Sequence, residues 1–469
     1  MSQTRSPGVK LILVGAVAVL LALPLLMVYS LVTDREEQSR TAESAITAGW
    51  GGRQVVSGPV IAIPYVDRRA GSEILDDGDT VVRTEEYRGE VYLSPSSQSL
   101  ETELEPQIKS KSIYNSVIYL AGFAGQARFE LPEELGVQGI SRSELLLEEA
   151  EIRFGVSDPR GLQSNASVAL DGANLELRPG KGVAASGNSG FYTAFDWSGG
   201  ELIEVRYSFS LRGSHSLALV PRGGNTEWSV TSPWPHPAFG GGFLPEQSEV
   251  SGEGFSAQFG IANLALGQPL VSLVDPVWTV EDEARPSDRY DERTRPAFDP
   301  AQSSHVASIG LVEPVDLYSQ VDRAVKYGFL FIGFTFLVLL MFDVIAGAAV
   351  ATAEYVLTGA GLVLFFVMLL AFAEVIGFMA AYLFASTAII GLLTAYTSAV
   401  LKSWKRARFM GAMLVVLYAA IYVLLSLEAF SLLVGSVLLF LALAGVMYGT
   451  RNVDWSSVGQ FEETASEEG

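Results

Sequence analysis

The sequence predicts a membrane protein with six helical spans, one N-terminal and five C-terminal, and a large mainly-β, sandwich-like extracytoplasmic domain between them. Three observations predict this fold class. Five long apolar runs follow one another between residues 325 and 450, another covers residues 9–32, and the polar middle of the chain alternates short β-rich runs with Gly/Pro turns. A run of about 18 or more apolar residues is long enough to cross a bilayer as a helix.

Composition limits the possible functions. The 469 residues carry a net charge of −21, and none of them is cysteine. Disulfides, thiol nucleophiles and cysteine metal sites are therefore excluded. So acidic a chain repels nucleic acid and anionic lipid, and neither is an expected ligand. The spacing of His215, His236 and His305 matches no metal motif, so we expect no metal and no cofactor.

The N-terminal apolar run predicts an uncleaved membrane anchor. Residues 1–8 would lie in the cytoplasm and residues 9–32 would cross the membrane. A secretory signal is the alternative, because Arg5 precedes the apolar core. The run is longer than a normal signal core, however, and it ends in Leu31 and Val32 with no small-residue cleavage site. Pro24 is expected to kink the helix without ending it, because neighbouring helices in a bilayer can accommodate such a kink.

The middle of the chain, residues 33–326, predicts the extracytoplasmic domain. Residues 34–40 leave the membrane as helix or linker, and the Gly-rich segment 49–65 reads as a turn feeding a strand rather than a phosphate loop. Apolar residues at 205, 207, 209 and 211 alternate with polar ones, which is typical of a half-buried strand. Further strands are predicted at 90–93, 151–156, 175–178 and 217–220, in an antiparallel sandwich or two sandwich-like halves. Residues 141–150 predict a short helix.

Two later segments of this domain have their own predictions. Residues 232–245, SPWPHPAFGGGFLP, predict an ordered loop and not a strand, because proline cannot donate to a β-ladder. Its Trp234, His236 and Phe239 are candidates for a recognition surface; the alternative is a loop that caps the sandwich with its aromatic rings tucked in. Residues 281–299 predict an exposed loop, and residues 311–326 have apolar residues at helical spacing.

The C-terminal spans are predicted at 327–349, 355–373, 375–401, 409–427 and 429–449, followed by an acidic cytoplasmic tail at 450–469. Lys/Arg enrichment marks cytoplasmic loops. Arg5 and Lys10 place the N-terminus inside, and the basic loop 402–408 is inside as well. Six spans satisfy both conditions and place residues 33–326 outside. Arg323 and Lys326 oppose this orientation, but a long translocated domain before them weakens their effect.

Four carboxylates near the ends of spans are candidate functional residues: Asp343, Glu354, Glu374 and Glu428. Ionisable residues within spans are functional candidates by default. Glu374 and Glu428 each stand at the turn of a predicted helical hairpin at the outer face, and the similar flanks suggest a weak repeat. Two interpretations remain open: solvated turn residues, or a polar seam that docks the outer domain or binds a cation.

The chain resembles the CreD family of bacterial inner-membrane proteins over nearly its whole length. The resemblance is carried by GWGGRQVVSGPVIAIPY, SDPRGL, GSHSLALVPRG, SPWPHPAFGGGFLP and GFSAQF in the middle of the chain, and by the apolar segments 325–343, 353–378 and 417–455. One departure is Val375, where the family pattern has a histidine beside the glutamate, so a histidine-dependent role at that turn is not expected here. The resemblance implies the layout described above and an association with a two-component regulatory system, colicin tolerance, envelope integrity and β-lactam response. It implies no biochemical activity and no catalytic residues.

These observations predict a non-enzymatic envelope protein whose outer domain binds or senses an envelope component. Its expected partners are the lipid bilayer and an unknown envelope component or protein, with no nucleic acid. A transporter or channel using the acidic residues is the alternative, although the second, fifth and sixth spans offer almost no polar residues at midplane depth. An envelope hydrolase is the third hypothesis, and the sequence contains no GxSxG, HExxH or Walker motif for it.

Overall fold

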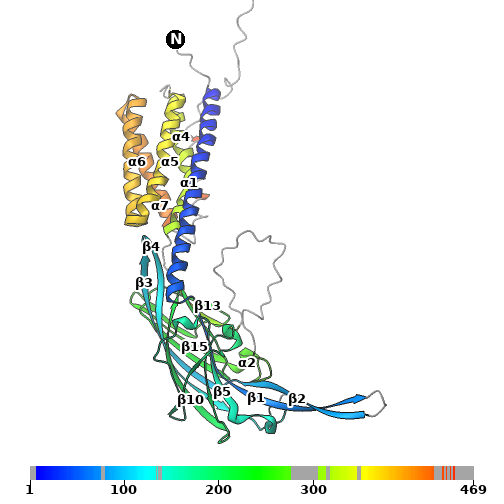
Figure 1. The fold of residues 1–469 in the computed structure, drawn as a ribbon. Coiled ribbons are helices and arrows are strands. Elements are labelled where there is room, and N and C mark those ends of the chain that lie inside the picture. The colour runs from blue at the N-terminus through cyan, green and yellow to red at the C-terminus, as the bar shows by residue number, and fades with distance from the viewer. Residues whose placement is uncertain are drawn as a thin grey trace, which may run out of the picture. The chain divides into compact units, whose positions relative to one another are not determined.

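The computed structural model describes residues 7–74, 80–133, 135, 140–275, 305–312, 317–345 and 350–426, together with 436, 437, 440, 444, 447, 448 and 451. The chain divides into two compact units. The helical unit consists of Met1–Arg40 and Val315–Gly469, and the sheet unit consists of Thr41–Pro314. The first boundary between the units falls inside helix α1, so this one helix contributes residues to both (Figure 1).

Within its described residues, the helical unit contains the first part of α1 and five later helices. Their bounds are α1 Pro7–Trp50, α3 Leu317–Lys326, α4 Gly328–Ile345, α5 Thr352–Ile376, α6 Phe378–Val400 and α7 Trp404–Ser426. Five segments of the described residues are long and apolar enough to cross a membrane: Lys10–Trp50, Leu317–Asp343, Thr352–Ile376, Phe378–Val400 and Trp404–Leu425. They correspond to five of the six predicted spans. The sixth, 429–449, lies almost entirely outside the described residues, as does the exposed loop predicted at 281–299.

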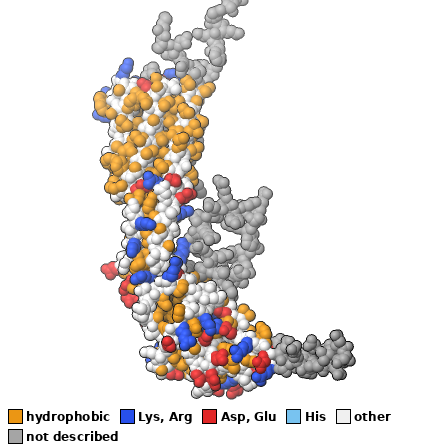
Figure 2. Space-filling model, viewed as in Figure 1, with side chains coloured by type: hydrophobic (Ala, Val, Ile, Leu, Met, Phe, Trp, Pro, Cys, Tyr) orange, Lys and Arg blue, Asp and Glu red, His pale blue; other side chains and the backbone are white. Residues whose placement is uncertain are grey.

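The faces of α1 show why this helix packs and still suits a lipid environment. Its buried side chains recur at spacings of three, four and seven residues, as in Val14, Val17, Leu21 and Val28, which places them on one side of the helix. Exposed leucines and a methionine cover the other sides. Hydrophobic side chains cover the visible surface of the helical unit in the same way (Figure 2). A helix that is apolar on its exposed faces is typical of a membrane bundle.

The turn between α5 and α6 differs slightly from the prediction. Glu374 was expected to form the turn, but it lies within the last helical turn of α5, which continues to Ile376. Gly377 makes the turn with a φ of 80°, and α6 begins at Phe378. This left-handed backbone conformation suits glycine, because any other residue would place a Cβ against its own backbone.

The sheet unit contains two sheets within its described residues. Sheet A has nine strands: β1 Gln54–Ile74, β2 Thr80–Leu93, β5 Ala150–Val156, β8 Arg178–Pro179, β9 Gly190–Phe195, β11 Ser216–Val220, β13 Pro237–Gly241, β16 Val271–Ser272 and β17 Ala307–Leu311. Sheet B has eight: β3 Ser97–Lys111, β4 Tyr114–Glu130, β6 Ser167–Leu170, β7 Ala173–Asn174, β10 Leu202–Ser214, β12 Asn225–Ser232, β14 Gln247–Ser251 and β15 Gly254–Ala262. A short helix, α2 (Asn263–Leu266), follows β15.

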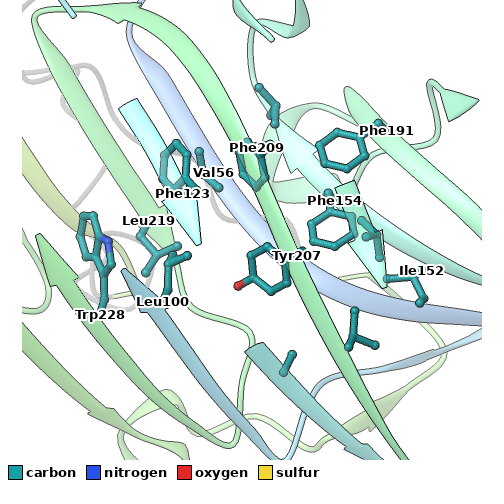
Figure 3. Close-up of a cluster of buried hydrophobic side chains, with 14 of the residues drawn as sticks. Val56, Leu100, Phe123, Ile152, Phe154, Phe191, Tyr207, Phe209, Leu219 and Trp228 are labelled. Carbon is teal, nitrogen blue, oxygen red and sulfur yellow. The ribbon is translucent and has the colours of Figure 1, made fainter. Parts of the chain in front are cut away.

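One hydrophobic core lies between the two sheets (Figure 3). Phe154 of β5 stacks on Phe191 of β9 with ring centroids 4.8 Å apart, and both strands belong to sheet A. Across the core, Phe154 meets Tyr207 of β10 edge-on at 5.1 Å, and Phe209 of the same strand stacks on Phe123 of β4 at 4.7 Å. These contacts join the inner faces of both sheets, so the unit is a single sandwich rather than two halves.

The strand predictions were mostly confirmed. The alternating residues 205–211 lie in β10, and Val205, Tyr207, Phe209 and Leu211 are all buried. The predicted strands 90–93, 151–156 and 217–220 lie in β2, β5 and β11. The strand predicted at 175–178 was wrong: its leucines pack against the core without joining a ladder, and only Arg178 enters a strand.

Three other predictions need correction. Pro237–Gly241 forms strand β13, although a loop was predicted; β13 is the edge of sheet A and begins with its proline, a position where the missing donor is tolerated. The helix predicted at 141–150 is two 3-10 turns, Arg142–Glu144 and Leu147–Glu149, interrupted where Leu145 bridges to Tyr65. The sandwich is also not purely antiparallel, because β1 pairs in parallel with β11, and β3 with β12.

Candidate functional site

The C-terminal end of α1 is fixed to sheet B. Trp50, the last residue of the helix, donates its indole N–H to the carbonyl of Tyr119 at 3.2 Å. The Arg212 guanidinium carbon lies 4.4 Å from the centre of the indole ring, and the Lys109 Nζ lies 5.0 Å from it. Tyr119, Arg212 and Lys109 belong to β4, β10 and β3 of sheet B. Cation–π contacts of this kind contribute about 0.5–2 kcal/mol each.

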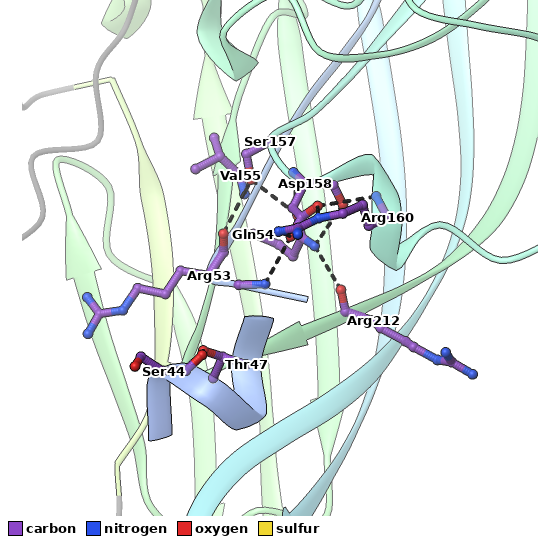
Figure 4. A network of polar contacts seen from close by, with 10 residues as sticks. Ser44, Thr47, Arg53, Gln54, Val55, Ser157, Asp158, Arg160 and Arg212 are labelled. Atoms are coloured by element: carbon purple, nitrogen blue, oxygen red, sulfur yellow. Dashed lines mark hydrogen bonds and ion pairs between the residues drawn. The ribbon is translucent and has the colours of Figure 1, made fainter. Parts of the chain in front are cut away.

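Gln54, the first residue of β1, is the centre of the polar network that continues from the helix end (Figure 4). It is 1% exposed. Its Nε2 donates to the carbonyls of Arg212 at 2.8 Å and Asp158 at 3.2 Å. Its Oε1 accepts the Asp158 N–H and the Ser157 hydroxyl, both at 3.1 Å. The amide thus uses both donor hydrogens and both acceptor positions, which makes it specific for this geometry.

Asp158 and the glycines complete what we call the α1 joint, defined by Trp50, Gly52, Gln54, Asp158 and Arg212. The Asp158 carboxylate accepts a hydrogen bond from the N–H of Gly52 at 3.3 Å. It also forms an ion pair with the Arg160 guanidinium at 2.8 Å. The Arg160 hydrogen bonds hold the pKa of Asp158 below its usual range, against the effect of partial burial. A Cβ on Gly51 would stand 2.6 Å from the Arg212 carbonyl, so the backbone approaches closely only because that residue is glycine.

The turn between β10 and β11 ties the joint to β17, the last strand of the sheet unit in chain order. Ser214 donates its N–H to Gly52 at 3.0 Å, and Leu311, the last residue of β17, donates its N–H to the carbonyl of His215 at 2.7 Å. The chain therefore enters and leaves the sheet unit at the same turn. His215 itself has a left-handed φ of 59°, and its Nε2 lies 3.4 Å from the Ser116 hydroxyl. Burial, and the charge of Arg53, lower the pKa of its imidazole.

Three of the segments that carry the family resemblance meet at this joint. Gly51–Gln54 come from GWGGRQ, Ser157 and Asp158 from SDPRGL, and Ser214 and His215 from GSHSLALVPRG. The first segment was predicted only as a turn that feeds a strand, and nothing in the sequence singled out Gln54, Asp158 or Arg212. The one available signal was that these segments recur in the family pattern, and it did not reveal that they lie together.

The predicted carboxylates at the span ends serve as ties within the helical unit. Asp343 of α4 is 2% exposed; its Oδ1 accepts the ammonium of Lys10 at 2.8 Å and the N–H of Val350 at 3.1 Å. Glu374 of α5 lies 3.8 Å from Arg35 and accepts the Tyr318 hydroxyl at 3.3 Å. Both pairs join α1 to the later helices.

The other two carboxylates do not join these pairs. Glu354 folds back on its own helix start and accepts the N–H of Ala351 at 2.7 Å. It is an N-terminal cap of α5, which favours a local structural role. Glu428 lies outside the described residues. The structure thus does not bring the four carboxylates into one cluster within the part of the chain that it describes.

The spacing of Lys10 and Arg35 explains how charged pairs fit a membrane helix. Arg35 follows Lys10 by 25 positions. At about 1.5 Å per residue the two lie about 38 Å apart along α1, which is more than the roughly 30 Å of the hydrocarbon core. Both pairs therefore fit at the two edges of the bilayer, where the cost of a charge is smallest.

The predicted recognition loop is largely packed against the sandwich. Trp234 donates its indole N–H to the Val312 carbonyl at 3.1 Å. Phe239 meets Phe255 edge-on at 5.8 Å and Phe259 at 6.3 Å. The side chain of His236 is exposed. For Trp234 and Phe239 this packing favours the interpretation of a cap with its rings tucked in.

An open groove of about 680 Å³ lies on the outer face of sheet B. Its row of side chains crosses four adjacent strands, because Glu103, Thr231, Ser256 and Glu249 are successive register partners in β3, β12, β15 and β14. The groove offers carboxylates and hydroxyls for hydrogen bonds. The described residues contain no group of three or more His, Asp or Glu side chains arranged to hold a metal ion.

Comparison with known proteins gives a consistent result. The family model described as "Inner membrane protein CreD" matches residues 6–456. Inner membrane protein CreD of Escherichia coli (strain K12) is 29% identical over 463 residues, which cover 97% of this chain and 95% of that protein. Among solved structures, that of native yeast LTA4 hydrolase aligns with a TM-score of 0.18 and 9% identity over 35% of this chain and 27% of that one, a likeness too low to support any argument. Because the family model covers nearly the whole chain, this multi-pass inner membrane protein belongs to the CreD family.

Proposed function

We propose that this protein is a non-enzymatic component of the cell envelope, whose sheet unit lies on the extracytoplasmic side and binds or senses an envelope component. The protein thereby supports envelope integrity or the response to envelope stress. The observation that carries the proposal is the α1 joint, in which a membrane helix ends in a saturated hydrogen-bond network shared by both sheets. A change of strain in the sandwich has a direct physical route into α1.

The proposal includes a topology of six spans with both termini in the cytoplasm. Arg5 and Lys10 at the first span and the basic loop 402–408 support it through the positive-inside rule. The sixth span, 429–449, is required to bring the acidic tail back to the cytoplasm. With this topology the sheet unit and its groove face the periplasm, where an envelope component is accessible.

The contacts of the carboxylates favour this role over transport. A transport pathway needs ionisable or polar groups at midplane depth that exchange partners with a substrate. Asp343 and Glu374 instead hold Lys10 and Arg35 at positions that suit the membrane edges. Among the described residues, the ion pairs between α1 and these two carboxylates are at Lys10 and Arg35, and neither is near the middle of the apolar part of α1.

A genetic complementation experiment tests the proposed function. A strain lacking the gene should be sensitised to envelope stress, for example by detergents, β-lactams or colicins, and the wild-type gene should restore resistance. Gln54→Leu removes all four amide hydrogen bonds of the joint, and we expect it to restore little resistance although the protein still reaches the membrane. Gln163→Leu is a matched control, because the Gln163 amide donates only to Gly161 beside it.

The outcome has a clear interpretation. Wild-type behaviour of the deletion strain under every envelope stress would contradict the proposed role. Full complementation by Gln54→Leu at normal protein levels would show that the joint does not carry the function. Protein levels in the membrane fraction must be measured for each variant, since replacing a buried, fully bonded amide costs on the order of 3 kcal/mol of folding free energy.

A further inference from the structure

The end of the β3–β4 hairpin projects from the sandwich. Strand β12 pairs with β3 only as far as Glu103, and β10 pairs with β4 only as far as Ile118. Beyond them the two strands pair with each other alone, down to the pair Lys111–Tyr114. The tip, residues 107–115, thus extends about 13 Å past its neighbours. Figure 1 shows this end of β3 and β4 beside the last turns of α1.

The charge of one face of β3 changes sign toward the tip. Glu101, Glu103 and Glu105 are exposed on the outward face, which continues with Lys109 and Lys111. The sequence has no Asp or Glu between Glu105 and Glu130. In a chain of net charge −21, this segment is therefore locally cationic. The overall charge argues against anionic ligands for the chain as a whole, but it does not apply to this tip.

The tip also exposes apolar side chains that a soluble strand end does not need. Ile108 is 58% exposed on the face that is buried along the rest of β3, and Ile113 is 46% exposed in the two-residue turn. Ser112 before it has a φ of 60°, which fits the tight turn of a two-residue hairpin. Two forces hold a segment in a membrane interface, namely burial of apolar side chains and attraction of cations to anionic lipid. Exposed isoleucines beside lysines can provide both.

We infer that this tip is a membrane-contact element, which inserts Ile113 into the interface of an anionic bilayer while Lys111 contacts lipid phosphates. Charge complementarity identifies the partner, because the tip is cationic and the surface of a membrane containing anionic lipid is negative. The location agrees: Lys109 lies over Trp50, the last residue of a helix that continues into the membrane.

A single fluorescent label tests the inference in the full-length protein. The chain has no cysteine, so Ile113→Cys carries an environment-sensitive dye at one site. Reconstituted in vesicles that contain phosphatidylglycerol, the dye should emit at shorter wavelength and be quenched by lipids with a nitroxide near the headgroup. In vesicles of phosphatidylcholine alone, or at high salt, both effects should weaken, because headgroup attraction is screened.

Variants separate charge from general exposure. Lys111→Gln should lower the ratio of docked to free tip roughly fivefold. Arg206→Gln removes one positive charge elsewhere on the sheet unit and should leave the signal unchanged. Leu264→Cys, at an apolar side chain that is 93% exposed in α2, provides a label expected to stay in water in both lipid mixtures.

Two results would overturn the inference. A dye at residue 113 that emits as in water in both lipid mixtures would show that the tip does not touch the membrane. A shifted emission with no nitroxide quenching, equal in both lipid mixtures and unchanged by Lys111→Gln, would show that the tip rests on protein instead. Neither result depends on the stress phenotype, so this inference and the proposed function fail independently.

Discussion

At the scale of single residues, the proposed function depends on side chains whose partners are distant in the sequence. Gln54 bonds to residues 104 and 158 positions away. No local pattern distinguishes a glutamine that joins two sheets from one that lies on a surface, because the partners that make the difference are distant in the sequence. The strand that begins at Gln54 was predictable from local pattern, whereas the role of its first side chain was not.

The neighbouring His215 gives a prediction of pH dependence. Burial and the charge of Arg53 lower the pKa of its imidazole in the folded protein. The unfolded chain binds the proton more readily, so the contribution to the free energy of unfolding is complete above the ordinary histidine pKa of about 6.5. It should decline as the pH falls from there toward the lower pKa of the folded state. Thermal unfolding of the full-length protein in detergent, followed by tryptophan fluorescence between about pH 7.5 and about pH 5, measures this.

His215→Asn is the control for this dependence. Asparagine tolerates the left-handed φ of this position and has no group that titrates in this range. The variant should keep its fold and lose the decline in unfolding temperature over the same range. Parallel curves for the two proteins would mean that another group accounts for the effect.

At the scale of elements, the sheet unit uses cross-strand pairs of tyrosine and glycine. Three such pairs are register partners, namely Tyr65 with Gly89, Tyr119 with Gly213, and Tyr207 with Gly125. In each, the tyrosine ring lies over the glycine, where a Cβ would stand 2.3 to 2.6 Å from ring atoms. The ring covers the backbone that glycine leaves exposed. One of these tyrosines also bonds at the joint, because the Tyr119 carbonyl accepts the Trp50 indole N–H and its hydroxyl donates to the Ser216 carbonyl.

The elements that the sequence predicted best were those with a strong period. The alternation in β10 correctly predicted a strand, and the apolar runs correctly predicted helices. Burial of one face requires apolar residues at every second position, and burial of all faces requires an unbroken apolar run. The strand β13 and the parallel pairs β1–β11 and β3–β12 were missed. Their ladders are set by which strands meet in three dimensions, and a proline at a strand start reads locally as loop.

The ion pair between Lys10 and Asp343 gives a prediction at this scale. Asp343→Asn keeps an acceptor for the Val350 N–H but leaves the Lys10 ammonium without its counter-charge. Loss of one partner of a buried pair costs about 3–5 kcal/mol, and partial exposure of Lys10 places this pair toward the lower end. Lys10→Met should also destabilise the protein. The double variant Lys10→Met/Asp343→Asn should recover most of the loss, because no unpaired charge remains.

Thermal unfolding in detergent checks the cycle of these variants. Arg35→Met is the matched control on the same helix: its 3.8 Å pair with Glu374 is 40% exposed on the arginine side, and an exposed pair contributes at most about 1 kcal/mol. Additive effects of Lys10→Met and Asp343→Asn would contradict the interpretation that the pair acts as one unit tying α1 to α4.

At the scale of the whole molecule, the ties arrange the functional parts along one helix. Lys10 and Arg35 join α1 to the later helices, and Trp50 joins its end to the sandwich. The proposed function gives α1 a role beyond anchoring the domain, and anchoring was all that the composition of this helix predicted. Whether a signal is carried outward or inward depends on the side of the membrane where the sandwich stands, so the proposed function requires one sidedness.

The absence of cysteine makes that sidedness directly measurable. Ser164→Cys places a thiol on an exposed turn of the sheet unit, and Trp404→Cys places one at the exposed start of α7, beside the basic loop. We expect a membrane-impermeant maleimide to label residue 164 in intact spheroplasts and residue 404 only after permeabilisation, because Lys402, Lys405, Arg406 and Arg408 hold their loop in the cytoplasm. The opposite pattern would place the sandwich in the cytosol. An envelope component would then have no access to it, and the joint would connect α1 to a cytoplasmic domain instead.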